Sequence, residues 1–501
     1  MSLSILKKYF KRAWAPTLVI TIIFFVNYFL FGIENTLIGP FATLSYLRFR
    51  NMRHHYGCMI KTFLIYAGMA LIAWLALLNL GLNIVMNAAA LFMIANYIID
   101  EYNPNNYFPA GMALIFFQIS PARGTEILTR WMALFVSFVI IFLFIEITQR
   151  RKKTCILEEY AREGLSLSYD LADAVEERNQ DKKDNLQKDI CSLNRKMSYE
   201  IYSDNRAALK FQPDANRYCR FLVCFQTAQY LAQQGDAQGI RKLVAEYEAA
   251  LEDDTVTTDI RKLKLREAKP DVRRFRFRFA LRQVLIVTPC LVFGYLVPEY
   301  NSYWMAISVF FMMIPIYENT MKRIIQRVRG SLAGIIICMI LFAIFKSFWA
   351  RVVLMTIFNF LIYCVDSYAF MVTYITGSAL SLNLLEPSVP LMMLQRIGYT
   401  LVGAGIAFLA NKYVFPIRVK NEMGYMQKLL EKIRQQMTEI YSSELAPGDV
   451  QHRTNSLIVK SYMLIDRIQE YNNTLKEEEK NPELDKNLRN HTLFMAGFLN
   501  K

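Results

Sequence analysis

Two arginines, Arg130 and Arg396, lie inside apolar segments that are long enough to span a membrane. Each stands about five or six residues into an expected helix, roughly 8–9 Å from its end at 1.5 Å per residue. A cation at that depth is costly and usually faces a cavity or a partner. Guanidinium groups grip carboxylates through two parallel hydrogen bonds, so the two arginines predict an anion site between the halves of the chain. Alternatively, both reach to the outer interface and pair with Glu126 or Glu386.

A short basic segment follows the second apolar segment of each half. These two segments contain Arg48, Arg50 and Arg53 in the first half, and Lys322, Arg323, Arg327 and Arg329 in the second. The two segments could form a vestibule whose positive potential attracts organic anions. Arg53 and Arg327 are the residues of these segments that we take as candidates for the substrate pathway. Cytosolic loops of membrane proteins are rich in lysine and arginine in any case, so flanking charge explains the two segments equally well.

Tyr303 and Trp304 form an aromatic pair at the start of a short apolar segment. Their rings could stack on an aromatic substrate, or they could belong to the belt of aromatic residues found at membrane interfaces. Short spans that contain proline at matching places of two halves often mark the binding region of a transporter. The second spans of this chain contain Pro40 and Pro315, so both interpretations of the aromatic pair stay open.

Asp100 and Asp366 end the fourth expected helix of each half. A membrane carboxylate whose pKa is raised by burial can take up a proton in an exporter that is driven by the proton gradient. A carboxylate at a helix end can equally be a solvated surface group. Proton coupling is therefore one hypothesis for this pair of aspartates.

The sequence lacks the residue sets of several other functions. Its four histidines are scattered and its eight cysteines include no CxxC pair, so we expect no metal site and no disulfide. It contains no GxxxxGK[ST] loop and no nucleophile–base pair, so we expect no cofactor and no enzyme activity. The net charge of +15 lies mainly beside apolar segments, as in other membrane proteins, so we expect no nucleic-acid partner.

Hydrophobic residues make up 54% of the 501 residues, and charged residues only 20%. The apolar residues form continuous runs of membrane-spanning length, which predicts an all-α polytopic membrane protein. We expect a first transmembrane repeat at 1–148, a cytosolic helical domain at 149–272, a second transmembrane repeat at 273–416 and a helical cytosolic tail at 417–501. Clusters of basic residues place both termini in the cytosol.

The two apolar halves resemble each other. A single offset, 366 − 100 = 266, superposes Asp100 on Asp366 and Arg130 on Arg396. Because each half has six apolar segments, an even number, both halves enter the membrane from the same side. We therefore predict two parallel six-helix transmembrane repeats that are related by a pseudo-twofold axis along the membrane normal.

Residues 303–334 carry the motif of a known superfamily. The Tyr-Trp pair starts a short apolar run that ends near a proline, and the pattern R-x-x-G-[ST]-x-x-G follows, with Arg327, Gly330, Ser331 and Gly334. Upstream, Leu281-Arg282 is similar to a Leu-Arg pair at the start of the preceding helix. This arrangement resembles the fusaric-acid-resistance-like superfamily, which includes bacterial aromatic acid exporters and, distantly, plant aluminium-activated malate transporters.

The resemblance implies a transporter of the cytoplasmic membrane that exports organic anions, aromatic carboxylates in particular, through a positively lined pathway between the two halves. A passive anion channel, similar to the malate-transporting relatives, is one alternative. A membrane scaffold or regulator that acts through the cytosolic domain is another, because the soluble insert is long. The expected partners are membrane lipids and a small organic anion, and the sequence leaves a homo-oligomer open.

Overall fold

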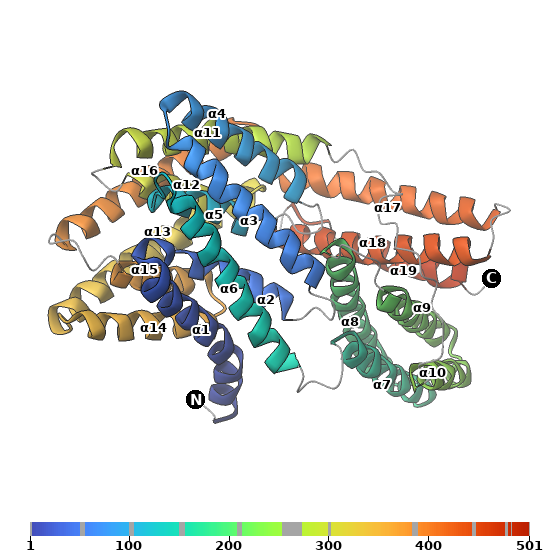
Figure 1. Ribbon diagram of the computed structural model, residues 1–501. Helices are drawn as coiled ribbons and strands as arrows, with labels where there is room; N and C mark the ends of the chain where they lie inside the picture. Colours follow the sequence, from blue (N-terminus) through green and yellow to red (C-terminus); the bar gives the residue numbers. More distant parts are fainter. Residues whose placement is uncertain are drawn as a thin grey trace. The chain divides into compact units, whose positions relative to one another are not determined.

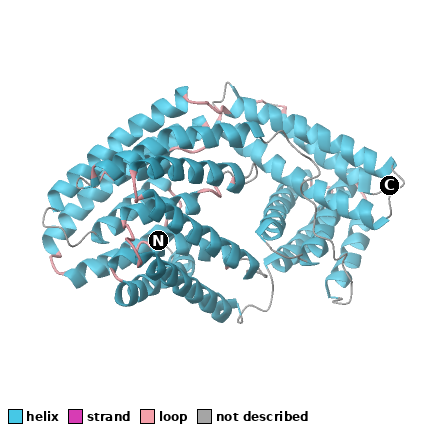
Figure 2. Cartoon of the chain, turned by 45° about the horizontal axis from the view of Figure 1, so that its top comes forward, coloured by secondary structure: helices cyan, strands magenta, loops and turns pink. Residues whose placement is uncertain are grey.

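The computed structural model describes residues 3–50, 56–99, 105–149, 156–207, 213–252, 273–298, 302–382, 389–442, 447–475, 479–481 and 483–499. Every regular element among these residues is a helix, as Figure 2 shows, which confirms the predicted all-α class. The chain divides into two compact units. Unit 1 contains Met1–Arg50, Met59–Arg150 and Val272–Arg418, and unit 2 contains Asn51–Cys58, Arg151–Asp271 and Val419–Lys501.

The apolar helices form two series, labelled in Figure 1. The first series is α1 (Leu3–Phe31), α2 (Ile38–Phe49), α3 (Tyr56–Ala76), α4 (Leu80–Met93), α5 (Phe108–Ile119) and α6 (Glu126–Gln149). The second series is α11 (Arg273–Leu296), α12 (Tyr303–Met312), α13 (Tyr317–Ile344), α14 (Phe348–Cys364), α15 (Tyr368–Leu382) and α16 (Val389–Tyr413).

Seven helices of the described residues are long and apolar enough to cross a membrane. They are Tyr9–Phe31, Tyr56–Ala76, Leu80–Ile98, Glu126–Thr148, Phe275–Leu296, Thr320–Ile344 and Leu391–Tyr413. The apolar helices α5, α12 and α14 have only 10–17 residues, fewer than the roughly 20 that a straight crossing needs. The chain is therefore a membrane protein with several spans, in which short helices lie beside full-length ones.

The first helix of each series packs against the fourth helix of the other series. Helix α1 lies along α14, where Phe24 joins Val352 and Met355 in one apolar cluster. Helix α11 lies along α4, where the rings of Phe92 and Phe277 are 5.7 Å apart. The two series are thus held together by apolar contacts within a single compact unit.

The chain leaves the helical conformation between α12 and α13. Pro315 has no N–H group to continue a helix, and the backbone of Met313 is extended, with φ −83° and ψ 92°. Tyr107 donates its hydroxyl to the carbonyl of Met313 at 3.1 Å. Arg282 Nη2 donates to the carbonyls of Ile314 at 2.9 Å and Pro315 at 2.7 Å. Because an unpaired carbonyl is costly inside a membrane protein, these side chains stabilise the break.

Unit 2 combines helices from two distant parts of the chain. They are α7 (Ile156–Glu176), α8 (Gln180–Ala207), α9 (Pro213–Gln234) and α10 (Ala237–Glu252) from the insert, and α17 (Val419–Ser442), α18 (Pro447–Thr474) and α19 (Leu484–Leu499) from the tail. Helix α18 packs against α8, where Asn194 Nδ2 donates to the hydroxyl of Tyr462 at 3.1 Å, and α19 packs against α9. The insert and the tail therefore form one body.

The stability of unit 2 should fall as the pH drops below neutral, because His491 of α19 is buried. Its Nε2 lies 3.2 Å from Ser461 Oγ, and burial, with a smaller effect of Arg434, lowers the pKa of His491 to about 4. The unfolded chain takes up this proton near pH 6.5, whereas the folded chain does so only near pH 4. Stability is thus lost between these two pH values, by about 3 kcal/mol in total.

Thermal unfolding of the full-length protein at about pH 7.5 and about pH 5 checks this expectation. The variant His491→Asn has no group that titrates in this range, so its unfolding temperature should depend less on pH than that of the wild type. An equally steep pH dependence in both proteins would contradict the role of His491.

Candidate anion-binding site

Helix α13 carries two arginines, Arg323 and Arg327, four residues apart on one side of the helix. Two glycines of the same helix let it approach α15 closely. A Cβ atom on Gly330 would lie 2.4 Å from the carbonyl oxygen of Ala369, and one on Gly334 would lie 2.6 Å from that of Thr373. The close approach allows Arg327 Nη1 to donate to the hydroxyl of Tyr368 at 3.3 Å. The glycines of the sequence motif therefore position its arginine.

Replacing Gly330 with alanine should weaken both the fold and the site, because the new Cβ would meet backbone atoms that cannot move aside. We expect the free energy of unfolding to fall by about 1–3 kcal/mol. Gly405→Ala on α16 is the matched control, since nothing lies within 4 Å of a Cβ at that position, and it should be neutral or slightly stabilising. Thermal unfolding in detergent measures both variants, and equal effects would contradict the packing argument.

Three arginines, Arg323, Arg327 and Arg396, each lie over an aromatic ring, and we call them the arginine cluster. The guanidinium carbon is 4.5 Å from the ring centroid of Tyr368 for Arg323, 4.5 Å from that of Phe311 for Arg327, and 3.9 Å from that of Trp304 for Arg396. Aromatic faces stabilise cations through their negative potential and leave the edges of the guanidinium group available.

The arginine cluster has hydrogen-bond donors that no protein group uses. Arg327 is 4% exposed and Arg396 is 5% exposed. Arg396 Nη1, Arg327 Nε and Arg323 Nε are buried without a partner. Among the described residues, no carboxylate forms an ion pair with any of the three, although Arg327 and Arg396 are close enough to repel each other. Buried unpaired charge is unfavourable, so this region is suited to an anion that supplies the missing partner.

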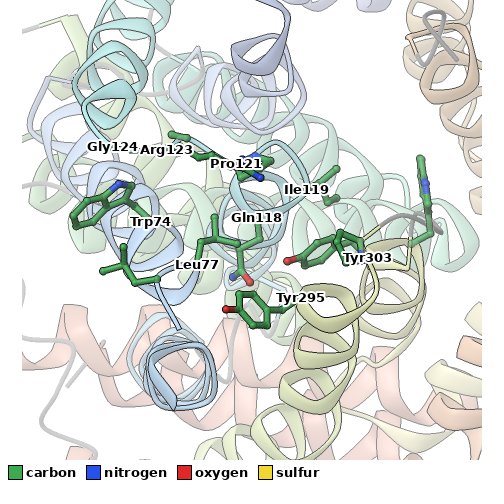
Figure 3. Close-up of a pocket in the computed structure, with 13 residues that line it drawn as sticks. Trp74, Leu77, Gln118, Ile119, Pro121, Arg123, Gly124, Tyr295 and Tyr303 are labelled. Atoms are coloured by element: carbon green, nitrogen blue, oxygen red, sulfur yellow. The ribbon is translucent and has the colours of Figure 1, made fainter. Parts of the chain in front are cut away.

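A cavity of about 380 Å³ lies beside the aromatic pair. Figure 3 shows Tyr303 among the residues that line it. Tyr303 and Trp304 line it, together with residues from the ends of α3, α5 and α11. Gln118 also lines the cavity, and its Nε2 donates to Asn87 Oδ1 at 2.6 Å. Arg396 stacks on the indole ring of Trp304, and Trp304 also lines the cavity. The cavity and the arginine cluster are therefore neighbours.

These residues fall in a region with known relatives. Residues 289–410 match the family "Fusaric acid resistance protein-like". The resemblance predicted from residues 303–334 is confirmed, and we call 289–410 the fusaric-acid-resistance-like region. It contains the whole arginine cluster and its three supporting rings.

Two curated proteins are similar to parts of the chain. "Inner membrane protein YccS" of Escherichia coli (strain K12) is 31% identical over 147 residues, which cover 28% of this chain and 20% of that protein. "Uncharacterized protein ORF2" of Neisseria gonorrhoeae is 26% identical over 173 residues, which cover 32% of this chain and 42% of that protein. The chain thus spans less than half the length of either relative. No solved structure matches.

Arg130 lies outside the fusaric-acid-resistance-like region, and each of its three guanidinium nitrogens donates a hydrogen bond. Its Nε donates to Asn35 Oδ1 at 3.2 Å, Nη1 to the carbonyl of Phe117 at 3.1 Å, and Nη2 to the carbonyl of Glu34 at 3.4 Å. All three partners belong to the first series, whereas Arg396 stacks on Trp304 of the second. The structure therefore does not place Arg130 and Arg396 in equivalent surroundings, and Arg130 joins the ends of α1 and α5.

The remaining predicted residues fall in different places. Arg53 and Asp100 lie outside the described residues. Asp366 forms an ion pair with Arg12, and the two side chains are 70% and 51% exposed. Pro315 follows the end of α12, whereas Pro40 lies in the first turn of α2. The two prolines are therefore not at equivalent points of their helices.

Sequence reasoning named Arg323 only as part of a basic segment, without singling it out for the site, and it missed Tyr368. The four-residue spacing of Arg323 and Arg327 on one helix was the signal that could have identified Arg323. The position of Tyr368 depends on how closely α13 approaches α15, which is a property of the packed structure.

Proposed function

We propose that the chain is a transporter of the cytoplasmic membrane that exports small organic anions, aromatic carboxylates in particular. The observation that carries the proposal is the arginine cluster, in which Arg327 and Arg396 are buried and each of the three arginines keeps a nitrogen without a partner. Among the described residues, none of the three forms an ion pair with a carboxylate. A bound carboxylate would accept hydrogen bonds from Arg396 and Arg327. Its ring would contact the aromatic side chains of Trp304 and Phe311, which surround these arginines.

The proposed pathway runs between the arginine cluster and the cavity that Tyr303 and Trp304 line. In the orientation that the basic segments favour, Arg327 lies toward the cytosolic side. Both termini and unit 2 are then cytosolic. The reciprocal packing of α1 on α14 and of α4 on α11 supports two parallel six-helix repeats, because a twofold axis exchanges these contacts.

A passive anion channel is the second candidate, and the environment of Asp366 favours it. Asp366 is exposed and forms an ion pair with Arg12, so it is not the buried carboxylate that coupling to a proton gradient requires. Proton coupling then depends on Asp100. A protonophore separates the two candidates, since it abolishes uphill export by a coupled transporter and leaves downhill flux through a channel unchanged.

Liposomes that contain the purified protein and labelled 4-hydroxybenzoate test the proposal. At about pH 7.5 the substrate is ionised and crosses lipid slowly, so the protein should increase its release well above that of protein-free liposomes. The release should saturate as the internal concentration rises. Release no faster than from protein-free liposomes, across a panel of aromatic and aliphatic carboxylates, would overturn the proposal and favour a membrane scaffold.

A further inference from the structure

Unit 2 contains a cavity of about 440 Å³ between four of its helices. Residues of α8 and α9 form one side, and residues of α18 and α19 form the other. Figure 1 labels these helices, which come from the insert and from the C-terminal tail of the chain. A molecule in this cavity would contact both parts at once.

Two glutamine side chains present amide donors to the cavity. Gln229 is 6% exposed, its Oε1 accepts a hydrogen bond from Cys191 Sγ at 3.5 Å, and its Nε2 is buried without a partner. Gln469 also lines the cavity, and its Oε1 accepts a hydrogen bond from Arg195. In both residues the oxygen is used by the protein and the N–H groups remain. The cavity therefore offers donors and requires a ligand that brings acceptors.

The charged residues of the cavity wall are Lys188, Arg195 and Asp184. Asp184 already accepts a hydrogen bond from Gln180 Nε2 at 3.3 Å. Asp466, which lies 3.7 Å from Arg195, is not among the lining residues. Arg195 Nε donates to the carbonyl of Cys191 at 3.2 Å, and its Nη1 contacts Gln469 and Asp466. The Nη2 of Arg195, Lys188 and the free amide N–H groups therefore remain as donors, which favours an anionic ligand.

The rest of the wall combines apolar side chains with the polar residues Gln187, Gln233 and Thr492. Ile465, Leu488 and Leu493 line it, and Tyr462 contributes a buried aromatic side chain. Apolar walls with a few well-placed polar groups are typical of sites for small organic molecules. An inorganic ion would leave these apolar groups without contacts.

We propose that this cavity binds a small organic carboxylate that has an apolar body. The carboxylate accepts hydrogen bonds from Gln229, Gln469 and Arg195, and the apolar body contacts Ile465 and Leu488. The bound anion joins the insert to the tail and stabilises their packing, so unit 2 acts as a sensor of its ligand. This inference does not rest on transport by unit 1.

Calorimetric titration of the full-length protein in detergent with benzoate tests the site, with benzamide as the uncharged probe of the same shape. Benzoate should bind saturably and benzamide at least about tenfold more weakly. Gln229→Met removes the unpaired amide at similar volume, and Arg195→Gln removes the cation. Each variant should weaken benzoate binding about tenfold while circular dichroism and size-exclusion profiles stay as in the wild type.

Arg396→Gln separates this site from the arginine cluster of unit 1, because it should leave binding at unit 2 unchanged. The inference would be overturned if Arg396→Gln abolished benzoate binding and Gln229→Met left it unchanged. The bound ligand would then be assigned to unit 1. Absence of saturable binding, or equal binding of benzamide, would also overturn it. The transport assay in liposomes is a separate readout, so either proposal can fail while the other stands.

Discussion

Replacing Arg396 with glutamine should lower the rate of 4-hydroxybenzoate release from liposomes by about 10–100-fold, because a hydrogen bond to a charged group contributes about 1.5–3 kcal/mol. Arg396 is buried against Trp304 and keeps an unpaired Nη1. The same change should leave the unfolding temperature unchanged or raise it, since it removes a buried cation that lacks a partner in the ligand-free protein. This combination of lost transport and retained stability is typical of a binding residue.

Two further variants define the role of Arg396. Arg396→Lys keeps the charge and loses the planar group that stacks on Trp304, so it should restore only part of the transport rate. Arg329→Gln removes one positive charge from an exposed position of α13 and serves as the control for net charge. Equal loss of transport in Arg329→Gln and Arg396→Gln would indicate a general electrostatic effect and contradict a specific contact.

Several features of the fold could be predicted from the sequence because they depend on local composition. Continuous apolar runs rather than alternating ones identified helices and a membrane protein. The short segment 303–334 identified the resemblance to the fusaric-acid-resistance-like proteins, and its Gly330 and Gly334 are needed where α13 touches the backbone of α15. Arg327 of the same motif is part of the arginine cluster, so the sequence motif combines the packing residues with one of the site residues.

Other features depend on contacts that sequence patterns do not encode. Arg130 and Arg396 lie at positions that the predicted repeat superposes, yet of these two arginines only Arg396 has a guanidinium nitrogen without a partner. The difference arises because the turn at Glu34 and Asn35 and the end of α5 supply acceptors to Arg130. Where a helix ends within a long apolar run is decided by tertiary packing, so these acceptors could not be located from the sequence.

Five buried or half-buried arginines of unit 1 fall into two groups according to their hydrogen-bond partners, although all five lie over aromatic rings. Arg130 and Arg282 donate to backbone carbonyls at the ends of helices, and their charge helps to stabilise irregular backbone inside the protein. Among the described residues, Arg323, Arg327 and Arg396 have no hydrogen bond to a backbone carbonyl, and each keeps an unpaired nitrogen. We therefore expect changes in the first group to affect stability and changes in the second group to affect anion binding.

Arg282→Met should be the most destabilising of the substitutions considered, with a loss of about 3 kcal/mol or more. Arg282 is 0% exposed, and its Nη1 donates to Asn411 Oδ1 at 2.6 Å in addition to the two carbonyl bonds of its Nη2. Methionine fills a similar volume but leaves the carbonyl of Pro315 and the amide oxygen of Asn411 without these donors. The protein should accumulate poorly in the membrane, and the fraction that folds should unfold at a lower temperature.

Arg278→Met provides the matched comparison, one helical turn earlier on α11. Arg278 is only partly buried and makes one such bond, from Nη2 to the carbonyl of Pro416 at 2.7 Å, so its loss should cost about 1 kcal/mol. The loss of stability in Arg282→Lys should lie between those of Arg278→Met and Arg282→Met. An ammonium group keeps the charge but cannot donate in the fixed directions of the guanidinium fork. Equal unfolding temperatures for Arg282→Met and Arg278→Met would mean that the break between α12 and α13 does not depend on Arg282. A graded order would show that the buried cation holds this break in place, because each lost donor leaves one more carbonyl unpaired.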